Sequence, residues 1–205
     1  MFPASQIALP LAPATGASRR IVIGSANERV VEALSRPQDW PFHAAVLTGP
    51  PRSGKSLLAE WFAASGRGAA IDGADGWDET ELFHRWNRAQ ESGQPLLLVA
   101  DREDWAVRLP DLASRIGGSA RLSIGLPDDA MTRDLLAAHA EQRRLALPDG
   151  AADYLLARLT RTHAAVEGIV AAIDRLSYER KAPATLSIWR EALETVEGPQ
   201  QARLL

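Results

Sequence analysis

The 205-residue chain contains no cysteine, and lysine occurs only at Lys55 and Lys181. The lack of cysteine excludes disulfide bonds, a thiol nucleophile and cysteine-ligated zinc or iron–sulfur sites. The 4 histidines are scattered and give no metal-ligand spacing. No apolar run approaches the ~20 residues that cross a bilayer, and the first residues lack the basic start and apolar core of a signal peptide. We therefore expect a cytoplasmic protein that does not bind membranes.

The charge balance disfavours a further class of protein. The chain has 23 basic and 26 acidic residues, a net charge of −3, and no long basic block. A protein that binds duplex DNA by itself normally needs a clustered cationic surface. We therefore expect no autonomous sequence-specific DNA binding. The hydrophobic fraction of 46% is typical of a well-folded chain.

Short apolar runs alternate with helical patterns in the first two thirds of the chain, which predicts a parallel α/β sheet flanked by helices. The predicted strands are 44–48, 68–72, 95–101 and 120–125, and the predicted helices are 27–35, 57–64 and 78–90. Only helical patterns follow, at 128–144, 150–160, 164–180 and 187–196. The predicted domains are a flexible arm over 1–20, an α/β core over 21–127 and a helical lid over 128–205.

The segment 49–56 reads GPPRSGKS, which fits the phosphate-binding pattern G-x-x-x-x-G-K-[ST] between a predicted strand and a predicted helix. Gly49 and Gly54 allow a tight turn that points successive N–H groups at phosphate oxygens. Lys55 would reach the β- and γ-phosphates, and the Ser56 hydroxyl would coordinate Mg²⁺. We therefore predict a site for ADP or ATP with Mg²⁺. Its predicted ligands in this loop are Gly49, Pro50, Pro51, Arg52, Ser53, Gly54, Lys55, Ser56 and Leu57.

A nucleotide site of this kind also needs an acidic residue at the end of a neighbouring strand to hold Mg²⁺. Two predicted strands end in such a residue, one in Asp72 and the other in Asp101. Composition alone does not choose between them.

Several segments together resemble the DnaA branch of AAA+ ATPases, and within it the Hda family of short DnaA-homologous regulators of replication initiation. The segment 21–27, IVIGSAN, is similar to the part of these proteins that packs on adenine. This similarity adds Ile23, Gly24 and Asn27 to the predicted nucleotide site. The resemblance covers nearly the whole chain and implies a P-loop AAA+ core followed by an all-helical lid.

The same resemblance implies an arginine finger. The segment 109–116, LPDLASRI, is similar to the family's finger segment, and the finger falls on Arg115. In the family this segment follows the sensor-1 strand, which makes 95–101 that strand and Asp72 the Mg²⁺ acid, with Asp101 as the alternative.

Two departures from the family pattern concern hydrolysis. Gly73 stands where a second acid often orients the attacking water, and Ala164 stands where an arginine of the lid normally reaches the γ-phosphate. Both departures remove a group that assists the reaction. The resemblance therefore implies nucleotide binding with weak or absent intrinsic hydrolysis.

The arm carries one further motif. Residues 6–11, QIALPL, resemble the Q-x-x-L-x-L/F peptide with which such proteins dock on the DNA sliding clamp, the β subunit of DNA polymerase III. Leucines in such a peptide fill an apolar pocket while the glutamine amide makes polar bonds. The predicted clamp ligands are Gln6, Ile7, Leu9 and Leu11.

The resemblance thus implies a regulator that docks on the clamp and stimulates hydrolysis of DnaA-bound ATP in trans through Arg115, with homo-oligomerisation left open. Within the same fold the alternative is a DnaA-paralogous adaptor or helicase-loader-like ATPase, which has no need of the clamp peptide. From other classes, a small P-loop metabolite kinase and a scaffold that binds no nucleotide remain as further alternatives.

Overall fold

The computed structural model describes residues 20–198, and these divide into two compact units. One unit comprises residues 26–125, which we call the sheet unit. The other comprises residues 20–25 together with 126–198, which we call the helical unit. The chain therefore passes between the units twice, after Ser25 and after Gly125.

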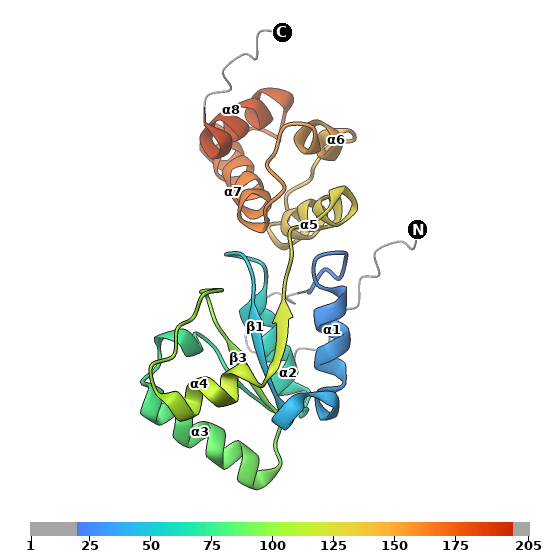
Figure 1. The fold of residues 1–205 in the computed structure, drawn as a ribbon. Helices are drawn as coiled ribbons and strands as arrows, with labels where there is room; N and C mark the ends of the chain where they lie inside the picture. The colour runs from blue at the N-terminus through green and yellow to red at the C-terminus, as the bar shows by residue number, and fades with distance from the viewer. Residues whose placement is uncertain (1–19, 199–205) are drawn as a thin grey trace. The chain divides into compact units, whose positions relative to one another are not determined.

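Four parallel strands form the sheet, in the order β2-β3-β1-β4 (Figure 1). They are β1 (Ala44–Thr48), β2 (Ala69–Ile71), β3 (Leu96–Val99) and β4 (Ala120–Ser123). Because all the strands run in one direction, their C-terminal ends share one edge of the sheet, the carboxyl edge, and their N-terminal ends share the opposite amino edge. The observed strands confirm the predicted parallel α/β sheet.

Helices cover both faces of this sheet, which is why every residue of β3 is buried. Alternate residues of a strand point to opposite faces. Val46 and Leu98 belong to the apolar cluster formed with α3 (Glu79–Ser92) and α4 (Pro110–Gly117). The other face is covered by α1 (Glu28–Ser35) and α2 (Lys55–Ala64) (Figure 1).

Three short 3-10 helices complete the sheet unit: η1 (Pro37–Asp39), η2 (Pro41–His43) and η3 (Ala74–Gly76). Local signals explain the ends of α3, the longest helix of this unit. Oδ1 of Asp78 accepts hydrogen bonds from the N–H groups of Thr80 and Glu81, both at 3.0 Å, and so caps the first turn. Gly93, with φ 66°, ends the helix in the left-handed conformation.

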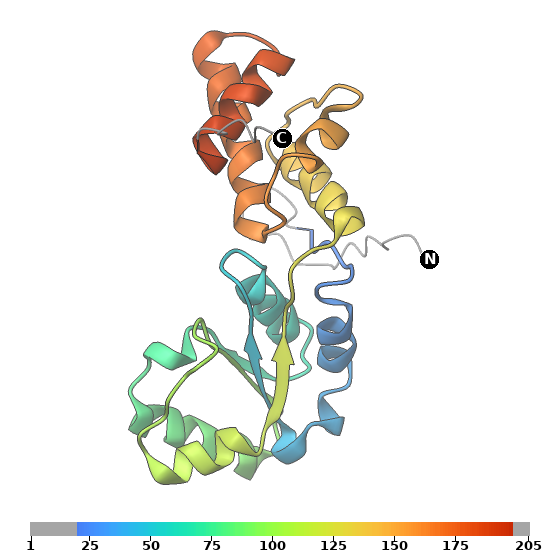
Figure 2. The ribbon, with the colours of Figure 1, turned by 45° about the horizontal axis from the view of Figure 1, so that its top comes forward.

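The helical unit contains α5 (Asp129–Gln142), α6 (Ala151–Leu156), α7 (His163–Arg180) and α8 (Leu186–Glu197). Helices α7 and α8 lie side by side in both ribbon views (Figures 1 and 2), and α7 also packs against α5. Its core is aliphatic, with Leu136, Leu155, Ile169 and Ile173 fully buried. The all-helical lid predicted from the sequence is confirmed.

Helix α6 is shorter than the predicted 150–160. It ends at Leu156, and the N–H of Arg158 bonds the carbonyl of Leu155 at 3.0 Å in a tighter turn. Thr160 donates to the Glu197 carboxylate through its N–H at 2.9 Å and its hydroxyl at 2.6 Å. The end of the predicted stretch is therefore bonded to α8, a contact that the helical period could not reveal.

Residues 20–25 pack within the helical unit. Nη1 of Arg20 lies 3.1 Å from Oε2 of Glu141 on α5. Gly24 lies so close to α5 that a Cβ there would be 2.9 Å from Cγ of Met131. No helix within residues 20–198 has the length and apolar content needed to span a bilayer.

Candidate functional site

The predicted phosphate-binding loop connects β1 to α2 at the carboxyl edge of the sheet. It turns through three residues of positive φ, Gly49 at 154°, Arg52 at 64° and Gly54 at 89°. Position 49 admits no side chain, because a Cβ there would lie 2.9 Å from Cβ of Ile124. The turn leads directly into α2, whose first N–H groups have no partner within the helix. Such a helix N-terminus favours an anion.

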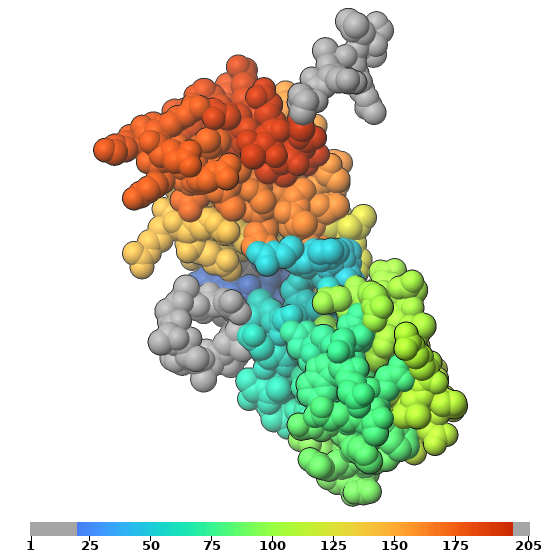
Figure 3. All heavy atoms as spheres, turned by 90° about the vertical axis from the view of Figure 1, so that its left-hand side faces the viewer, coloured from blue at the N-terminus to red at the C-terminus, as the bar shows by residue number. Residues whose placement is uncertain are grey.

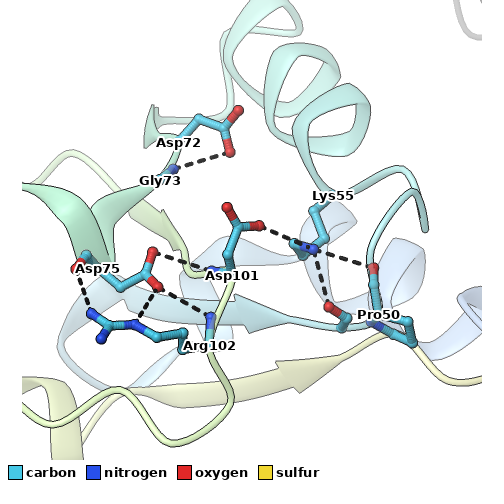
Figure 4. Close-up of polar contacts among 8 residues, drawn as sticks. Pro50, Lys55, Asp72, Gly73, Asp75, Asp101 and Arg102 are labelled. Carbon is cyan, nitrogen blue, oxygen red and sulfur yellow. Dashed lines mark hydrogen bonds and ion pairs between the residues drawn. The ribbon is translucent and has the colours of Figure 1, made fainter.

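Lys55 is the cation of this loop, and its side chain is only 7% exposed. Its Nζ donates to the carbonyl oxygens of Gly49 at 3.0 Å and Pro50 at 3.2 Å (Figure 4). It also lies 3.3 Å from Oδ1 of Asp101. A phosphate oxygen is a stronger acceptor for an ammonium group than a neutral carbonyl. Lys55 is therefore placed where it can exchange these carbonyls for a phosphate.

Ser53 provides a separate indication that the loop fits an anion. Its Oγ is buried and has no hydrogen-bond partner among the described residues, although buried polar groups are normally paired. It lies 3.2 Å from the position of a Cβ on Gly49, across the turn of the loop. The loop residues thus fit a phosphate chain, with Ser56 in the first turn of α2 as a candidate Mg²⁺ ligand.

The two candidate Mg²⁺ acids both lie at the carboxyl edge, Asp72 after β2 and Asp101 after β3. Asp101 is paired with Lys55, whereas Oδ1 of Asp72 accepts the N–H of Gly73 at 3.2 Å (Figure 4). No cluster of three or more metal-ligating side chains occurs in residues 20–198. A Mg²⁺ ion at this edge would therefore depend on phosphate oxygens as well as on protein ligands.

Asp75 in η3 is a residue of this edge whose role the sequence did not reveal. Its carboxylate is 8% exposed and accepts from the N–H of Asp101 at 3.2 Å and the N–H of Arg102 at 3.1 Å. Nε of Arg102 donates to the same carboxylate at 3.2 Å (Figure 4). Burial by itself raises the pKa of Asp75, but these hydrogen bonds outweigh it and hold the pKa below its usual range. The only feature of the sequence that pointed to a role for Asp75 at this edge was its position three residues after Asp72.

The three residues predicted to contact adenine are divided between the two units. Asn27 belongs to the sheet unit, is 3% exposed and precedes α1. Ile23 and Gly24 belong to the helical unit, where Ile23 is buried and Gly24 packs against Met131. The phosphate loop itself lies wholly in the sheet unit.

In the helical unit, the start of α7 carries Ala164, which is exposed and which the sequence resemblance placed at the position of a lid arginine. The nearest arginine along the chain is Arg161, whose Nε donates to Oδ1 of Asp129 on α5. This hydrogen bond lowers the pKa of the Asp129 carboxyl. Arg161 is therefore engaged by α5 within its own unit.

Arg115 lies in the last turn of α4, which leads into β4 at the amino edge of the sheet. Its guanidinium group lies over the ring of Phe83, 4.5 Å from the centroid. Its Nη1 donates to Oδ1 of Asn87, which like Phe83 is on α3. Arg115 is therefore oriented by one neighbouring helix and remains half-buried.

A hollow of about 490 Å³ adjoins Arg115 on the side of α3; Figure 3 shows the face that α3 forms, in green. Phe42 stands at this hollow with 60% of its surface exposed. Its φ is 54°, and its carbonyl accepts from Nε2 of Gln90 at 2.7 Å. A non-glycine residue in this conformation costs roughly 1–3 kcal/mol, and such strain concentrates at functional sites. The hollow is lined by Phe42, Trp86, Asn87, Gln90, Glu91, Ser114 and Arg115.

The predicted clamp peptide, with Gln6, Ile7, Leu9 and Leu11, lies outside the described residues. It stays a prediction.

Comparison with known proteins gives no match to any family profile. In sequence, an uncharacterized protein of Haemophilus influenzae is 30% identical over 127 residues, which is 60% of this chain. The chain spans about half of that relative's length, 54%.

The fold is similar to that of domain III of the replication initiation protein DnaA from Thermotoga maritima, with a TM-score of 0.73 and 15% identity over 87% of this chain and 95% of that one. This is a DnaA-type AAA+ fold. DnaA of Aquifex aeolicus with bound AMPPCP also matches it, with a TM-score of 0.58 and 19% identity over 78% of this chain and 67% of that one. A third similar structure is DnaA bound to AMPPCP and single-stranded DNA, with a TM-score of 0.57 and 17% identity over 78% of this chain and 66% of that one.

Proposed function

We propose that this chain is a nucleotide-binding regulator of replication initiation, of the Hda type, that stimulates the hydrolysis of ATP held by DnaA. The phosphate loop supports the nucleotide part of the proposal, since it holds Lys55 and the hydroxyl of Ser53, which has no hydrogen-bond partner among the described residues. Two DnaA structures of similar fold hold AMPPCP. ADP or ATP would bind through residues 49–57, with Mg²⁺ at Ser56 and one of the two strand-end acids.

The observation that carries the trans role is the separation of Lys55 from Arg115. Lys55 lies beyond the carboxyl end of β1, and the hollow of Arg115 includes Phe42, just before its amino end. The strand has 5 residues, a length of roughly 17 Å at ~3.3 Å per residue. Arg115 therefore has no path to the phosphates in its own loop, and as a finger it would act on the nucleotide of another subunit.

In this role Arg115 would supply positive charge to the γ-phosphoryl group while water attacks ATP held by DnaA, with ADP and phosphate as products. An arginine finger accelerates such hydrolysis by ~10³–10⁵. ATP bound in the phosphate loop of this chain would be hydrolysed slowly. Gly73 and Ala164 carry no group for that reaction, and Arg161 is bound to Asp129.

Contact with DNA would come from the sliding clamp through residues 6–11. The chain as a whole is acidic, with a net charge of −3, and this favours indirect over direct attachment to DNA. Docking on the clamp would restrict the activity to DNA that already carries one.

The proposal is tested by measuring hydrolysis of DnaA-bound ATP with this protein, clamp-loaded DNA and ADP, each omitted in turn. We expect Arg115→Ala to remove the stimulation, by at least ~10³-fold in rate. The matched control is Arg108→Ala, an exposed arginine seven residues earlier that contributes its main-chain N–H to a hydrogen bond. Equal stimulation by Arg115→Ala and the unchanged protein would overturn the finger role.

The clamp peptide needs its own measurement. A peptide of residues 1–20 is expected to bind the purified clamp, and the Leu9→Ala/Leu11→Ala pair is expected to lose that binding. A helicase-loader-like adaptor would show neither clamp binding nor stimulation of DnaA.

A further inference from the structure

One short segment after β2 is bonded to two parts of the chain that are distant from it in sequence. It begins at Asp75 in η3 and ends at Glu79, the first residue of α3. Each of these two carboxylates accepts main-chain N–H groups from a segment more than twenty residues away in sequence. Asp75 bonds the chain after β3, and Glu79 bonds the chain before α4.

The Asp75 contact lies at the carboxyl edge and joins η3 to the chain after β3. Its carboxylate holds the N–H groups of Asp101 and Arg102, and Nη2 of Arg102 donates in return to the main-chain carbonyl of Asp75 at 2.8 Å (Figure 4). Asp72 is joined to Asp75 through three peptide bonds. The contact therefore ties the segment of Asp72 to the main chain of Asp101, whose carboxylate is paired with Lys55.

The Glu79 contact also joins a carboxylate to main-chain N–H groups, here those of the chain before α4. The N–H of Arg108 donates to both oxygens of the Glu79 carboxylate at 3.0 Å, and the N–H of Leu109 donates to Oε2 at 2.6 Å. Leu109 is the residue before α4, the helix that carries Arg115. Leu112 and Ile116 are the buried residues of α4 and pack its inner face. The Glu79 contact fixes the position at which the same helix starts.

We propose that Asp75 and Glu79 are positioning residues for two different centres, Asp75 for the two acids at the carboxyl edge and Glu79 for the helix that carries Arg115. The inference rests on the proposed function, because it concerns the nucleotide loop and the finger named there. Groups that orient a metal ligand from behind typically change metal affinity or activity by about 10–100-fold when removed. Asp75 would act in this way on the acid that holds Mg²⁺, whether that acid is Asp72 or Asp101.

The first measurement is the Mg²⁺ gain, defined as the ratio of the Kd for ADP without Mg²⁺ to the Kd with it. We expect Asp75→Asn to reduce this gain about tenfold and to leave the Kd without Mg²⁺ within about twofold. A purely structural role would change both Kd values together or neither. Arg102→Ala removes only the guanidinium half of the contact, and we expect a smaller loss of the gain. Because Arg102 is exposed, this second variant keeps the test open if Asp75→Asn folds poorly.

The second measurement is the stimulation of DnaA-bound ATP hydrolysis, made at ADP concentrations that saturate each variant. We expect Glu79→Gln to lower the stimulation about tenfold, through misplacement of Arg115, while its Kd for ADP and its Mg²⁺ gain stay at the values of the unchanged protein. Asp75→Asn is expected to show the reverse pattern. Each variant is thus the matched control of the other, since both lose one carboxylate bonded to distant main-chain N–H groups.

The outcomes distinguish a failure of the positioning roles from a failure of the proposed function. If the unchanged protein binds no ADP or does not stimulate DnaA, the proposed function fails. If both activities are present but the two variants affect them equally, or not at all, the positioning roles are wrong and the proposed function stands.

Discussion

The two edges of the sheet hold the two cations of the proposed function, Lys55 and Arg115, in different ways. At the carboxyl edge, Lys55 is 7% exposed and is surrounded by oxygens of its own loop and of Asp101. At the amino edge, Arg115 is half-buried, lies on one aromatic ring and borders an open hollow. The first arrangement suits a small anion, whereas the second leaves the cation beside an open hollow, as the proposed finger role requires. The carboxyl edge can therefore be tested with a ligand alone, and the amino edge only with a second protein.

The largest effect that separates the edges is expected from Lys55→Ala. Loss of the ammonium group removes charge-assisted bonds to phosphate, each worth ~1.5–3 kcal/mol, so the affinity for ADP should fall about 100-fold. Calorimetric titration measures it, with Lys181→Asn as the control. Lys181 is the chain's only other lysine, and asparagine tolerates its φ of 49°. An unchanged affinity in Lys55→Ala would mean that the loop does not bind nucleotide.

Gly49→Ala tests whether the carboxyl edge is as tightly built as the structure indicates. The added Cβ would lie 2.9 Å from Cβ of Ile124 and 3.1 Å from its carbonyl oxygen. Overpacking of this kind typically costs ~1–3 kcal/mol of unfolding free energy, measurable by urea denaturation. Gly76→Ala is the control, because a Cβ there meets nothing within 4 Å. Equal stability of the two variants would contradict the close approach of the loop to Ile124.

A smaller effect is expected to distinguish the two acids at the carboxyl edge. Asp101 has Lys55 as its counter-ion, whereas Asp72 is paired with no cation among the described residues. We therefore expect Asp72→Asn to lose the Mg²⁺ gain in ADP affinity, by about tenfold or more. Asp101→Asn is expected to keep most of that gain. The reverse result would identify Asp101 as the Mg²⁺ acid.

The smallest effect concerns pH, in protein freed of divalent cations. The pKa of Asp75 is lower in the folded chain than the ~3.9 of an unfolded aspartate. The unfolded chain therefore takes up this proton first, and the stability that the charged Asp75 contributes is lost as the pH falls below the unfolded value. Urea midpoints should fall more steeply between about pH 5 and pH 3 in the unchanged protein than in Asp75→Asn. Parallel curves would show that the Asp75 contact contributes nothing to folding.

Much of the fold could be predicted from local patterns. The run 44–48 became β1 with the predicted bounds, and each of the other predicted strands contains an observed one. The phosphate loop was recognisable because its glycines, lysine and serine are adjacent in sequence, and so local geometry alone assembles them. The shorter α6 shows the limit of such patterns, since a contact with Glu197 replaces the last predicted turn.

The sequence by itself determined the class of fold and the loop that fits phosphates, because these depend on neighbouring residues and their period. The candidate finger, Arg115, followed only from the resemblance of residues 109–116 to a known family. Only the tertiary structure decided how distant segments meet. It brought Asp101 to Lys55 at the ends of two adjacent strands, and it bonded Asp75 to the chain after β3 and Glu79 to the chain before α4. It also packed Arg115 of α4 against α3, at the edge of the sheet opposite the phosphate loop. These contacts arise from strand order and helix packing, which bring together side chains that no local spacing relates.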